Sequence, residues 1–436
     1  MTNKIYLESL GCSKNLVDSE VMLGLLSEGG CGIVDLPEKA EIIIINTCSF
    51  VEDAVKEAIE TIYSLARKKS EGVCQYLIVC GCLPQRYGRE LLKEMPEVDL
   101  FLGTGEFQNI SSHIDKMING QVKERMLNSS NTFLMNDKTP RALISPGSSS
   151  YIKIAEGCSH KCTYCTIPSI RGEYQQRTQK SVLNEANRLA EQGIEEINLV
   201  AQDTSRFKGL PVLLKKLAKI DGLKWIRLLY CHPLNMSDDL IKVIAADKKV
   251  CKYIDIPLQH ISDSVLKRMG RRINREQTEK LILKMKDNIP DIALRTTMIV
   301  GFPGETDKDF MELMQFVKET QFDSLGAFIY SDEEGTPASR LKGKVDPKVK
   351  KDRFRELMRL QAGISRKKNS LKKGSQMEVL VEGISANEKY LLQARAEFQA
   401  PEVDGVVYLT DNVPIGSFVK VKITHSLTYD LVGKVL

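Results

Sequence analysis

Strand patterns alternate with helix patterns over most of the chain, and this alternation limits the fold more than any other feature. From Lys4 to about Gly120, apolar runs such as IYLESL, EIIIINT and QYLIVCG are separated by amphipathic helix patterns. Strands that alternate with helices pair in parallel, and the helices cover the sheet. We therefore expect an α/β fold that begins with an open parallel sheet in residues 1–127.

The alternation resumes after a polar stretch, 128–150, that we expect to be a linker. Six strand patterns then follow one another, each separated from the next by a helix pattern: YIKIA, EINLVA, WIRLLY, KYIDIPL, ALRTTMIVG and SLGAFIY. Six strand–helix units predict a partial (β/α)6 barrel, which would occupy residues 151–373. Its last segment, 346–373, carries 11 Lys and Arg against 3 Asp and Glu. Such a helix is either a solvated face or a contact to an RNA backbone.

The last segment, 374–436, changes to short alternating runs such as QMEVLVEG and FVKVKITHSL, separated by Gly, Asn and Pro. This pattern predicts a small antiparallel β-barrel. The segment has 5 Lys and Arg against 8 Asp and Glu. A mildly acidic barrel favours docking of a basic protein over an RNA backbone, because complementary charge raises encounter rates.

Length and cysteine content restrict the class of protein. A chain of 436 residues is too long for one core, so several domains are expected. The sequence shows neither a secretory signal pattern nor an apolar run of the roughly 18 residues that span a membrane. A cytoplasmic protein without membrane contact is therefore expected. Disulfides are rare in the reducing cytoplasm, so its 11 cysteines are expected to serve metal binding or catalysis instead.

Three cysteines lie within eight positions in the stretch GCSHKCTYC: Cys158, Cys162 and Cys165. They follow a predicted barrel strand, YIKIAEG, and so belong to the edge of the barrel where active sites are built. A structural zinc site would need a fourth ligand, for which His160 is the nearby candidate. A cluster of buried structural thiols is a second alternative. The third is a four-iron cluster on three cysteines, which leaves one iron open for a small molecule.

Three further cysteines each follow a predicted strand of the first segment: Cys12, Cys48 and Cys82. The carboxyl ends of parallel strands meet at one edge of a sheet, where ligands bind. These thiols are therefore expected to converge on a second metal site, unless their placement is accidental. Cys80 is expected to face the core, and four other cysteines are expected to be buried without a role: Cys31, Cys74, Cys231 and Cys251.

The spacing Cys-x3-Cys-x2-Cys, with Tyr164 before the last cysteine, resembles the signature of the radical S-adenosylmethionine (radical SAM) enzymes. The resemblance implies that the three cysteines hold a 4Fe–4S cluster whose open iron chelates SAM. An electron from the cluster would then break a carbon–sulfur bond of SAM and form a 5′-deoxyadenosyl radical. The resemblance also implies a set of SAM contacts: Tyr164, Gln202, Asp203, Gly301, Gly304 and Glu305.

Five stretches make nearly the whole chain similar to the radical SAM methylthiotransferases: SLGCSKNLVDSE, CSHKCTYCTIPSIRG, LVAQDTSRF, DIPLQHIS and YSDEEGTPA. The last segment resembles a TRAM domain. Ser169 after Ile-Pro, and Ala201-Gln202-Asp203 instead of Gly-Gln-Asn, resemble the protein-modifying branch of the family more than the transfer-RNA branch.

The family resemblance implies an enzyme, a sulfur-group transferase with two 4Fe–4S clusters that uses two SAM molecules. Its implied substrate is the β-carbon of an aspartate in small-subunit ribosomal protein twelve, and an adenosine of transfer RNA is the alternative. An electron donor such as flavodoxin or ferredoxin and a monomeric state are expected. An unactivated carbon is out of reach of ordinary acid–base catalysis, so no catalytic residues beyond the cluster ligands are expected. His232 and His260 are candidates for supporting roles, and a non-catalytic metal scaffold is the third functional class.

Overall fold

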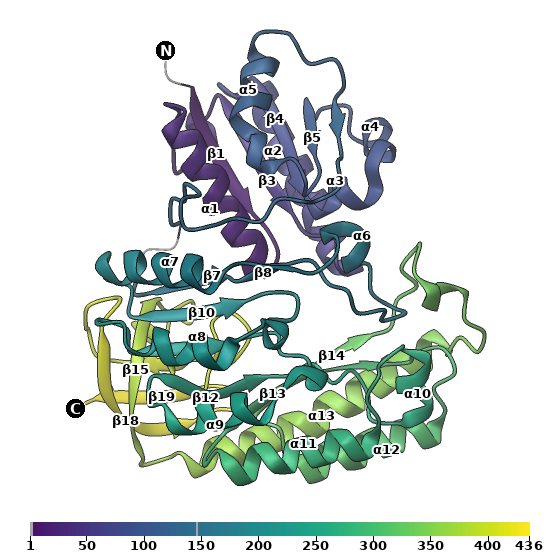
Figure 1. Cartoon of the computed structure of the whole chain (residues 1–436), viewed down its shortest axis with the longest axis vertical. Helices are drawn as coiled ribbons and strands as arrows, with labels where there is room; N and C mark the ends of the chain where they lie inside the picture. Colours follow the sequence, from purple (N-terminus) through teal and green to yellow (C-terminus); the bar gives the residue numbers. More distant parts are fainter. Residues whose placement is uncertain (1–2, 145–146) are drawn as a thin grey trace. The chain divides into compact units, whose positions relative to one another are not determined.

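The computed structural model describes residues 3–144 and 147–436, which form two compact units (Figure 1). The first unit consists of the described chain up to Ile144 together with Ala155–His160 and Cys165–Arg177. The second unit consists of the rest of the described chain. Among the helices so described, none is both long enough and apolar enough to cross a membrane.

The first unit contains a six-stranded parallel sheet in the order β2-β1-β3-β4-β5-β6. Its strands are β1 (Lys4–Ser9), β2 (Gly32–Ile33), β3 (Ile42–Thr47), β4 (Tyr76–Gly81), β5 (Leu100–Leu102) and β6 (Met126–Leu127). The predicted open parallel sheet is thereby confirmed. The sequence did not reveal β2, β5 and β6, because strands of two or three residues are too short to show a periodic pattern.

Helices pack on both faces of this sheet, since successive strand residues point to opposite sides. Ile43, Ile45 and Val79 share one core cluster with apolar residues of α2. Cys80, the next residue after Val79, instead places its sulfur 3.7 Å from that of Met22 in α1 and is fully buried, as predicted. The helices of the unit are α1 (Ser13–Glu28), α2 (Glu52–Glu71), α3 (Cys82–Tyr87), α4 (Leu91–Glu94), α5 (Ile110–Ile118) and α6 (Ile167–Arg171).

The predicted linker has little regular structure, but its described part up to Ile144 is packed against the first unit. Arg141 donates two hydrogen bonds to the Glu20 carboxylate of α1, at 2.9 and 2.6 Å. Both side chains are almost fully buried. A Cβ at Gly24 would lie 2.4 Å from the amide nitrogen of Arg141, so only glycine allows this close approach. Polar composition therefore indicated the absence of helix and strand here, but not the absence of packing.

The second unit contains six parallel strands in the order β14-β13-β12-β11-β10-β7, which confirms the six predicted barrel strands. Each strand lies beside the next of these six in chain order, as in a barrel that winds continuously. They are β7 (Ser149–Lys153), β10 (Glu196–Val200), β11 (Trp225–Leu228), β12 (Val250–Asp255), β13 (Ala293–Val300) and β14 (Ser324–Ile329). A two-stranded ribbon, β8 (Ala155–Glu156) with β9 (Gln175–Gln176), belongs to the first unit.

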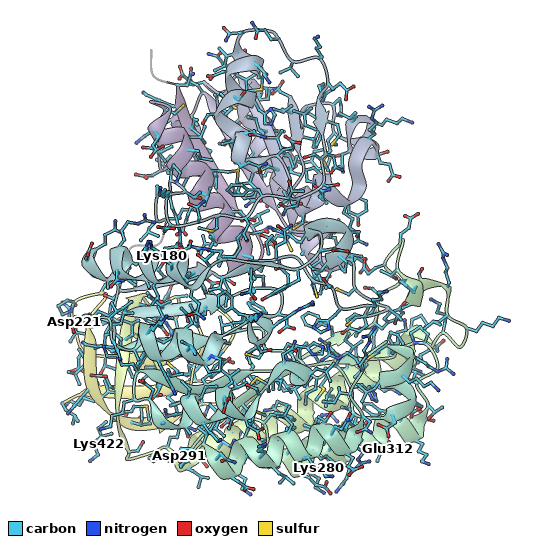
Figure 2. All side chains as sticks on the ribbon, in the orientation of Figure 1. Lys180, Asp221, Lys280, Asp291, Glu312 and Lys422 are labelled. Carbon is cyan, nitrogen blue, oxygen red and sulfur yellow. The ribbon has the colours of Figure 1, made fainter. Side chains whose placement is uncertain are left out.

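Helices alternate with these strands, as the sequence predicted. They are α7 (Gln179–Glu191), α8 (Leu210–Leu217), α9 (Asp238–Ala246), α10 (Asp263–Arg268), α11 (Arg275–Asn288) and α12 (Asp307–Thr320). The basic segment forms α13 (Pro347–Leu371), which packs on β14 and α12. Figure 2 shows basic side chains such as Lys180, Lys280 and Lys422 on the outside of the ribbon.

The last segment closes into a five-stranded barrel in the order β15-β16-β17-β19-β18, which confirms the predicted small β-barrel. Its strands are β15 (Gln376–Ile384), β16 (Leu392–Ala396), β17 (Val407–Leu409), β18 (Phe418–Ser426) and β19 (Leu431–Val435). The pairing is antiparallel except between β17 and β19, which are parallel. Closure of the barrel leaves no strand edge exposed for further pairing.

The barrel packs against the amino-terminal ends of the sheet strands in the same unit. Glu196, the first residue of β10, accepts hydrogen bonds from Arg395 of β16 at 3.1 and 2.5 Å. Trp225, the first residue of β11, meets Phe418 of β18 edge to face at 4.8 Å between ring centroids. Binding sites of barrel enzymes lie at the opposite, carboxyl ends of the strands. The barrel is therefore part of the structural support of this sheet.

Candidate metal and cofactor sites

The structure places three thiols of the first unit at the carboxyl ends of neighbouring strands. Cys12 follows β1 and directly precedes α1, Cys48 follows β3, and Cys82 follows β4 as the first residue of α3. In the sheet, β3 lies between β1 and β4. Cys48 and Cys82 are buried and Cys12 is partly exposed. The placement at the ends of neighbouring strands is as expected from the sequence, and binding of a metal by these thiols stays a prediction.

The loops that carry these cysteines are tied together around Asn15. Its side-chain amide donates to the carbonyls of Leu10 and Thr47, at 3.1 and 3.0 Å, and so joins the ends of β1 and β3. Gly11 has a φ of +93°, and a Cβ there would lie 2.5 Å from the Cβ of Cys48. The chain leading into Cys12 therefore runs directly against Cys48, which only glycine permits.

The electrostatics of this site suit a bound cation. Burial raises the pKa of Cys82 to about 12, although Arg171 opposes the shift, and burial together with Cys12 raises the pKa of Cys48. Burial also opposes ionisation of Cys12, but Lys14 and Arg171 lower its pKa below the ordinary value. Cys48 and Cys12 add to the raised pKa of Cys82, so the three thiols would repel one another once ionised. A metal that binds thiolates supplies the missing positive charge, so the donor set fits an iron–sulfur cluster.

Arg171 is a further residue of this site that the sequence patterns did not single out. One guanidinium nitrogen donates to Cys82 Sγ at 3.4 Å, and the other donates to Asp18 Oδ2 of α1 at 2.5 Å. The side chain is 2% exposed. The sequence shows an arginine shortly after the last cysteine of the loop, three residues beyond Pro168. It does not show which side chains this arginine would contact.

The Cys-x3-Cys-x2-Cys stretch has residues in each unit, and each part makes backbone hydrogen bonds within its own unit. Cys158 and Cys165 belong to the first unit and Cys162 to the second, and all three are partly exposed. In the first unit, the amide of Cys158 donates to the carbonyl of Gly172 at 3.0 Å. In the second, the amide of Thr163 donates to the carbonyl of Met269 at 2.9 Å, and Arg271 lies 4.0 Å from Cys162 Sγ.

The residues predicted to contact SAM lie in the second unit, on loops beside the carboxyl ends of sheet strands. Tyr164 packs edge to face on Phe302, with 6.4 Å between ring centroids. One residue, Ala201, separates the end of β10 from Gln202 and Asp203. Asp203 is buried, and its carboxylate accepts hydrogen bonds from Ser205 at 2.8 Å and from the side chain of Asn235 at 2.6 Å. Asp203 is therefore fixed in position.

Glu305 organises the loop that contains Gly301 and Gly304. One carboxylate oxygen accepts from the amides of Gly301 and Phe302 at 2.7 and 3.1 Å, and the other accepts from Arg353 at 2.8 Å. Its side chain is fully buried. These contacts give Glu305 a role in shaping the loop. A direct contact to SAM stays a prediction for this residue and for the two glycines.

The two histidines proposed for supporting roles differ in their surroundings. His232 is partly exposed, and its ring accepts a hydrogen bond from the amide of Leu234 at 3.3 Å. His260 is buried, accepts from the amide of Ser262 at 3.0 Å, and lies 3.7 Å from the Glu305 carboxylate. Burial lowers the pKa of His260 from 6.5 to about 4, and Arg353 adds to this shift against the opposite effect of Asp309.

We expect His260 to make the folded protein sensitive to acid. In the unfolded chain His260 takes up a proton below about pH 6.5, whereas in the folded chain it does so only near pH 4. The free energy of unfolding therefore decreases as the pH is lowered from 6.5 to 4. His260→Gln should abolish this loss, which amounts to roughly 3 kcal/mol. Urea denaturation at pH 7, 5.5 and 4 measures it, with His425→Gln on the exposed face of the barrel as control. Equal pH dependence in the His260→Gln and native proteins would contradict the expectation.

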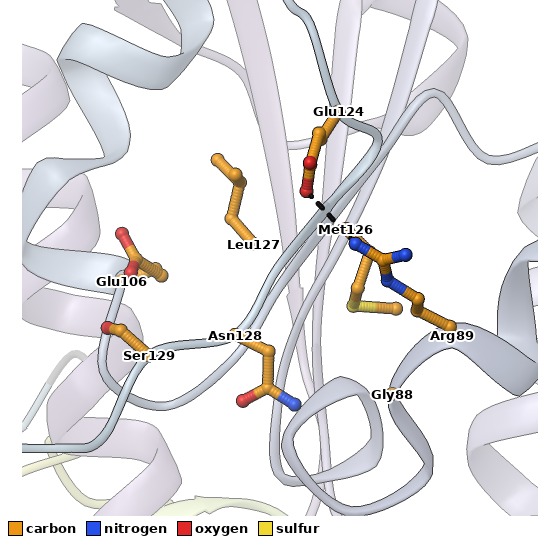
Figure 3. A pocket seen from close by; sticks show the side chains of 8 residues that line it. All are labelled: Gly88, Arg89, Glu106, Glu124, Met126, Leu127, Asn128 and Ser129. Carbon is orange, nitrogen blue, oxygen red and sulfur yellow. Dashed lines mark hydrogen bonds and ion pairs between the residues drawn. The ribbon is translucent and has the colours of Figure 1, made fainter.

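One hollow in the first unit lies apart from all predicted ligands. It has a volume of about 430 Å³ and is crossed by an ion pair of 3.4 Å between Arg89 and Glu124 (Figure 3). Its lining consists of Gly88, Arg89, Glu106, Glu124, Met126, Leu127, Asn128 and Ser129. None of these described residues is a predicted cluster or SAM ligand, so the hollow does not alter the assignment of the sites.

Three family models cover successive parts of the chain. Residues 4–103 match the family described as uncharacterized protein family UPF0004, residues 152–317 match the radical SAM superfamily, and residues 374–436 match the TRAM domain. The solved structure of the radical SAM methyltransferase TsrM from Kitasatospora setae, with tryptophan and a SAM analogue bound, has a TM-score of 0.59 at 14% identity. It covers 83% of this chain and 89% of its own, and at that identity it shows the fold alone.

Full-length relatives are much closer in sequence. The ribosomal protein uS12 methylthiotransferase RimO of Geotalea uraniireducens is 48% identical over 99% of this chain and 98% of its own. The RimO proteins of Geobacter sulfurreducens and Clostridioides difficile are 47% and 45% identical, each over 99% of this chain and over 98% and 99% of their own. Together with the three domain matches, these relatives show that the chain belongs to the RimO family of radical SAM methylthiotransferases.

Proposed function

We propose that this protein transfers a methylthio group to ribosomal protein uS12, at the β-carbon of an aspartate. The names of its relatives support uS12 as the substrate. The observation on this chain that carries the proposal is the set of three thiols at the ends of β1, β3 and β4, in addition to the Cys-x3-Cys-x2-Cys loop. Two separate sets of three thiols suit a reaction that needs a sulfur carrier as well as a radical source.

The two sets of cysteines would hold one 4Fe–4S cluster each, formed by Cys12, Cys48 and Cys82 and by Cys158, Cys162 and Cys165. When bound, these clusters and SAM would supply the sulfur, the methyl group and the radical needed to modify an unactivated carbon. The chain's own residues hold and orient them. Asp203 is fixed by its hydrogen bonds, and Glu305 holds the loop of Gly301 and Gly304 in shape. The proposed SAM contacts are Tyr164, Gln202, Asp203, Gly301, Gly304 and Glu305.

In this proposal, three segments of the chain have different roles. Residues 1–127 carry the first cluster, residues 151–373 carry the second cluster and SAM, and residues 374–436 dock the substrate. A one-electron donor such as flavodoxin or ferredoxin would supply the electron for a cluster held by Cys158, Cys162 and Cys165. The enzyme acts as a monomer in the cytoplasm, where ribosomal proteins are assembled.

Mass spectrometry tests the substrate directly. Ribosomal proteins and transfer RNA from a strain lacking this gene are compared with those from the parent strain. We expect uS12 alone to lose the mass of one methylthio group, and fragment ions should place the loss on an aspartate. Supplying the native gene should restore it, whereas a gene with Cys158, Cys162 and Cys165 replaced by Ala should not. Loss of methylthio groups from transfer RNA, with uS12 unchanged, would overturn the proposal.

A further inference from the structure

Arg171 joins the first set of cysteines to a buried network on α1. Its guanidinium donates to Cys82 Sγ at 3.4 Å, to Asp18 at 2.5 Å and to the side-chain oxygen of Asn15. Glu156 of β8 contributes a second carboxylate at 3.7 Å. All five residues are buried and belong to the first unit.

This arrangement is more than an ordinary buried ion pair. Burying a guanidinium and its carboxylates is costly, and apolar residues of similar volume often stabilise a fold equally well. A planar guanidinium is distinctive because its two terminal nitrogens can bond two different groups in fixed directions. Here one of them points to a carboxylate and the other to a thiol sulfur. The geometry thus delivers a fixed positive charge and an N–H donor to a predicted cluster ligand.

The position of Arg171 in the chain adds a second observation. It is the last residue of α6, which begins two residues after Cys165. Within the first unit, α6 is fixed by the hydroxyl of Thr104, which donates to the carbonyl of Ile170 at 2.6 Å. The segment that ends the second cysteine set therefore also supplies the guanidinium that contacts the first.

We propose that Arg171 is a positioning residue that donates a hydrogen bond to the Cys82 sulfur and sets the reduction potential of the cluster on Cys12, Cys48 and Cys82. The inference rests on the proposed function. Net charge and hydrogen bonds to sulfur are known determinants of cluster potentials. Arg171 favours the reduced, more negative cluster, and Asp18 holds the guanidinium in place while offsetting part of its charge.

The test uses full-length protein in which Cys158, Cys162 and Cys165 are replaced by Ala, so that only the first cluster remains. Iron content and a redox titration followed by electron paramagnetic resonance are measured. Arg171→Gln should lower the ratio of reduced to oxidised cluster about tenfold at the original midpoint, which equals a shift of about 59 mV for one electron. Asp18→Asn should shift the midpoint in the opposite, positive direction, and Arg171→Lys should fall between the Gln variant and the parent.

Arg141→Gln is the matched control. Its side chain is 3% exposed, against 2% for Arg171, and it also pairs with a carboxylate of α1. That carboxylate, Glu20, lies eight residues beyond Cys12 along the helix, a rise of about 12 Å. The control should bind iron normally and keep the parent midpoint.

Iron binding and midpoint separate the two hypotheses. If iron is bound and the midpoints of Arg171→Gln and Arg141→Gln agree, the role of Arg171 is overturned and the proposed function stands. If the protein with Cys158, Cys162 and Cys165 replaced by Ala binds no iron, both the role of Arg171 and the proposed function are overturned. If Arg171→Gln alone loses the iron, Arg171→Lys is compared with Arg141→Lys. A shift confined to Arg171→Lys supports the proposal, and equal midpoints refute it.

Discussion

Replacing Cys12, Cys48 and Cys82 together with Ala should stop methylthio transfer completely while SAM cleavage continues. The three thiols sit at one edge of the first sheet, whereas the predicted SAM contacts lie on loops of the second unit. Loss of one 4Fe–4S cluster should lower the iron content from about eight to about four per chain. Iron analysis after reconstitution without oxygen, and chromatography of 5′-deoxyadenosine, measure both effects.

The reciprocal change, at Cys158, Cys162 and Cys165, should abolish SAM cleavage and transfer together and leave about four irons. A triple replacement of Cys74, Cys231 and Cys251 is the matched control, because these thiols are buried and lie outside both sets. It should keep the full iron content. Zinc in place of iron, or an unchanged iron content in either ligand variant, would contradict the two-cluster proposal.

The sequence predicted the main sheets and the cysteine positions well, for a local physical reason. Strands of five or six apolar residues show their pattern within a short window, and the residue after a parallel strand lies at a known edge of the sheet. The positions of Cys12, Cys48 and Cys82 at the ends of β1, β3 and β4 follow from that alone.

Features that depend on distant partners could not be predicted in this way. Arg171 bonds Asp18 across 153 positions, and Arg141 bonds Glu20 across 121. No local pattern specifies such pairs. The expectation that four spare cysteines would be buried was right for Cys74, Cys231 and Cys251, but wrong for Cys31, which is partly exposed. The mild acidity of the last segment favours docking of a basic partner only where its acidic side chains are exposed, and the sequence alone does not tell which of them are buried.

Several charges of the C-terminal barrel are in fact committed to the sheet of the same unit. Glu196 lies between Arg395 of the barrel and Arg227 of β11, and all three are at most 1% exposed. Burial alone would raise the pKa of Glu196, but Arg395 and Arg227 lower it to about 2. Asp404 accepts a hydrogen bond from Tyr253 of β12 at 2.7 Å. The proposed docking of a basic partner would therefore rely on the remaining, exposed acidic residues of the barrel.

Glu196→Gln should destabilise the second unit by about 3–5 kcal/mol, because two buried guanidinium groups lose their shared carboxylate. The change can be followed at the junction itself. Trp225 is the only tryptophan of the chain, is 5% exposed and packs on Phe418 of the barrel. Urea denaturation monitored by tryptophan emission should show a lower midpoint in the variant and the same slope as the native protein.

Glu382→Gln is the control for this prediction, since Glu382 also pairs with Arg395 but its side chain is 23% exposed. Its replacement should cost no more than about 1 kcal/mol. Truncation after residue 373 extends the test, because it removes Arg395 and Phe418 together. The truncated protein should show red-shifted tryptophan emission and should lose SAM cleavage along with its fold. Native emission and native SAM cleavage after truncation would refute the supporting role and leave the barrel with substrate docking alone.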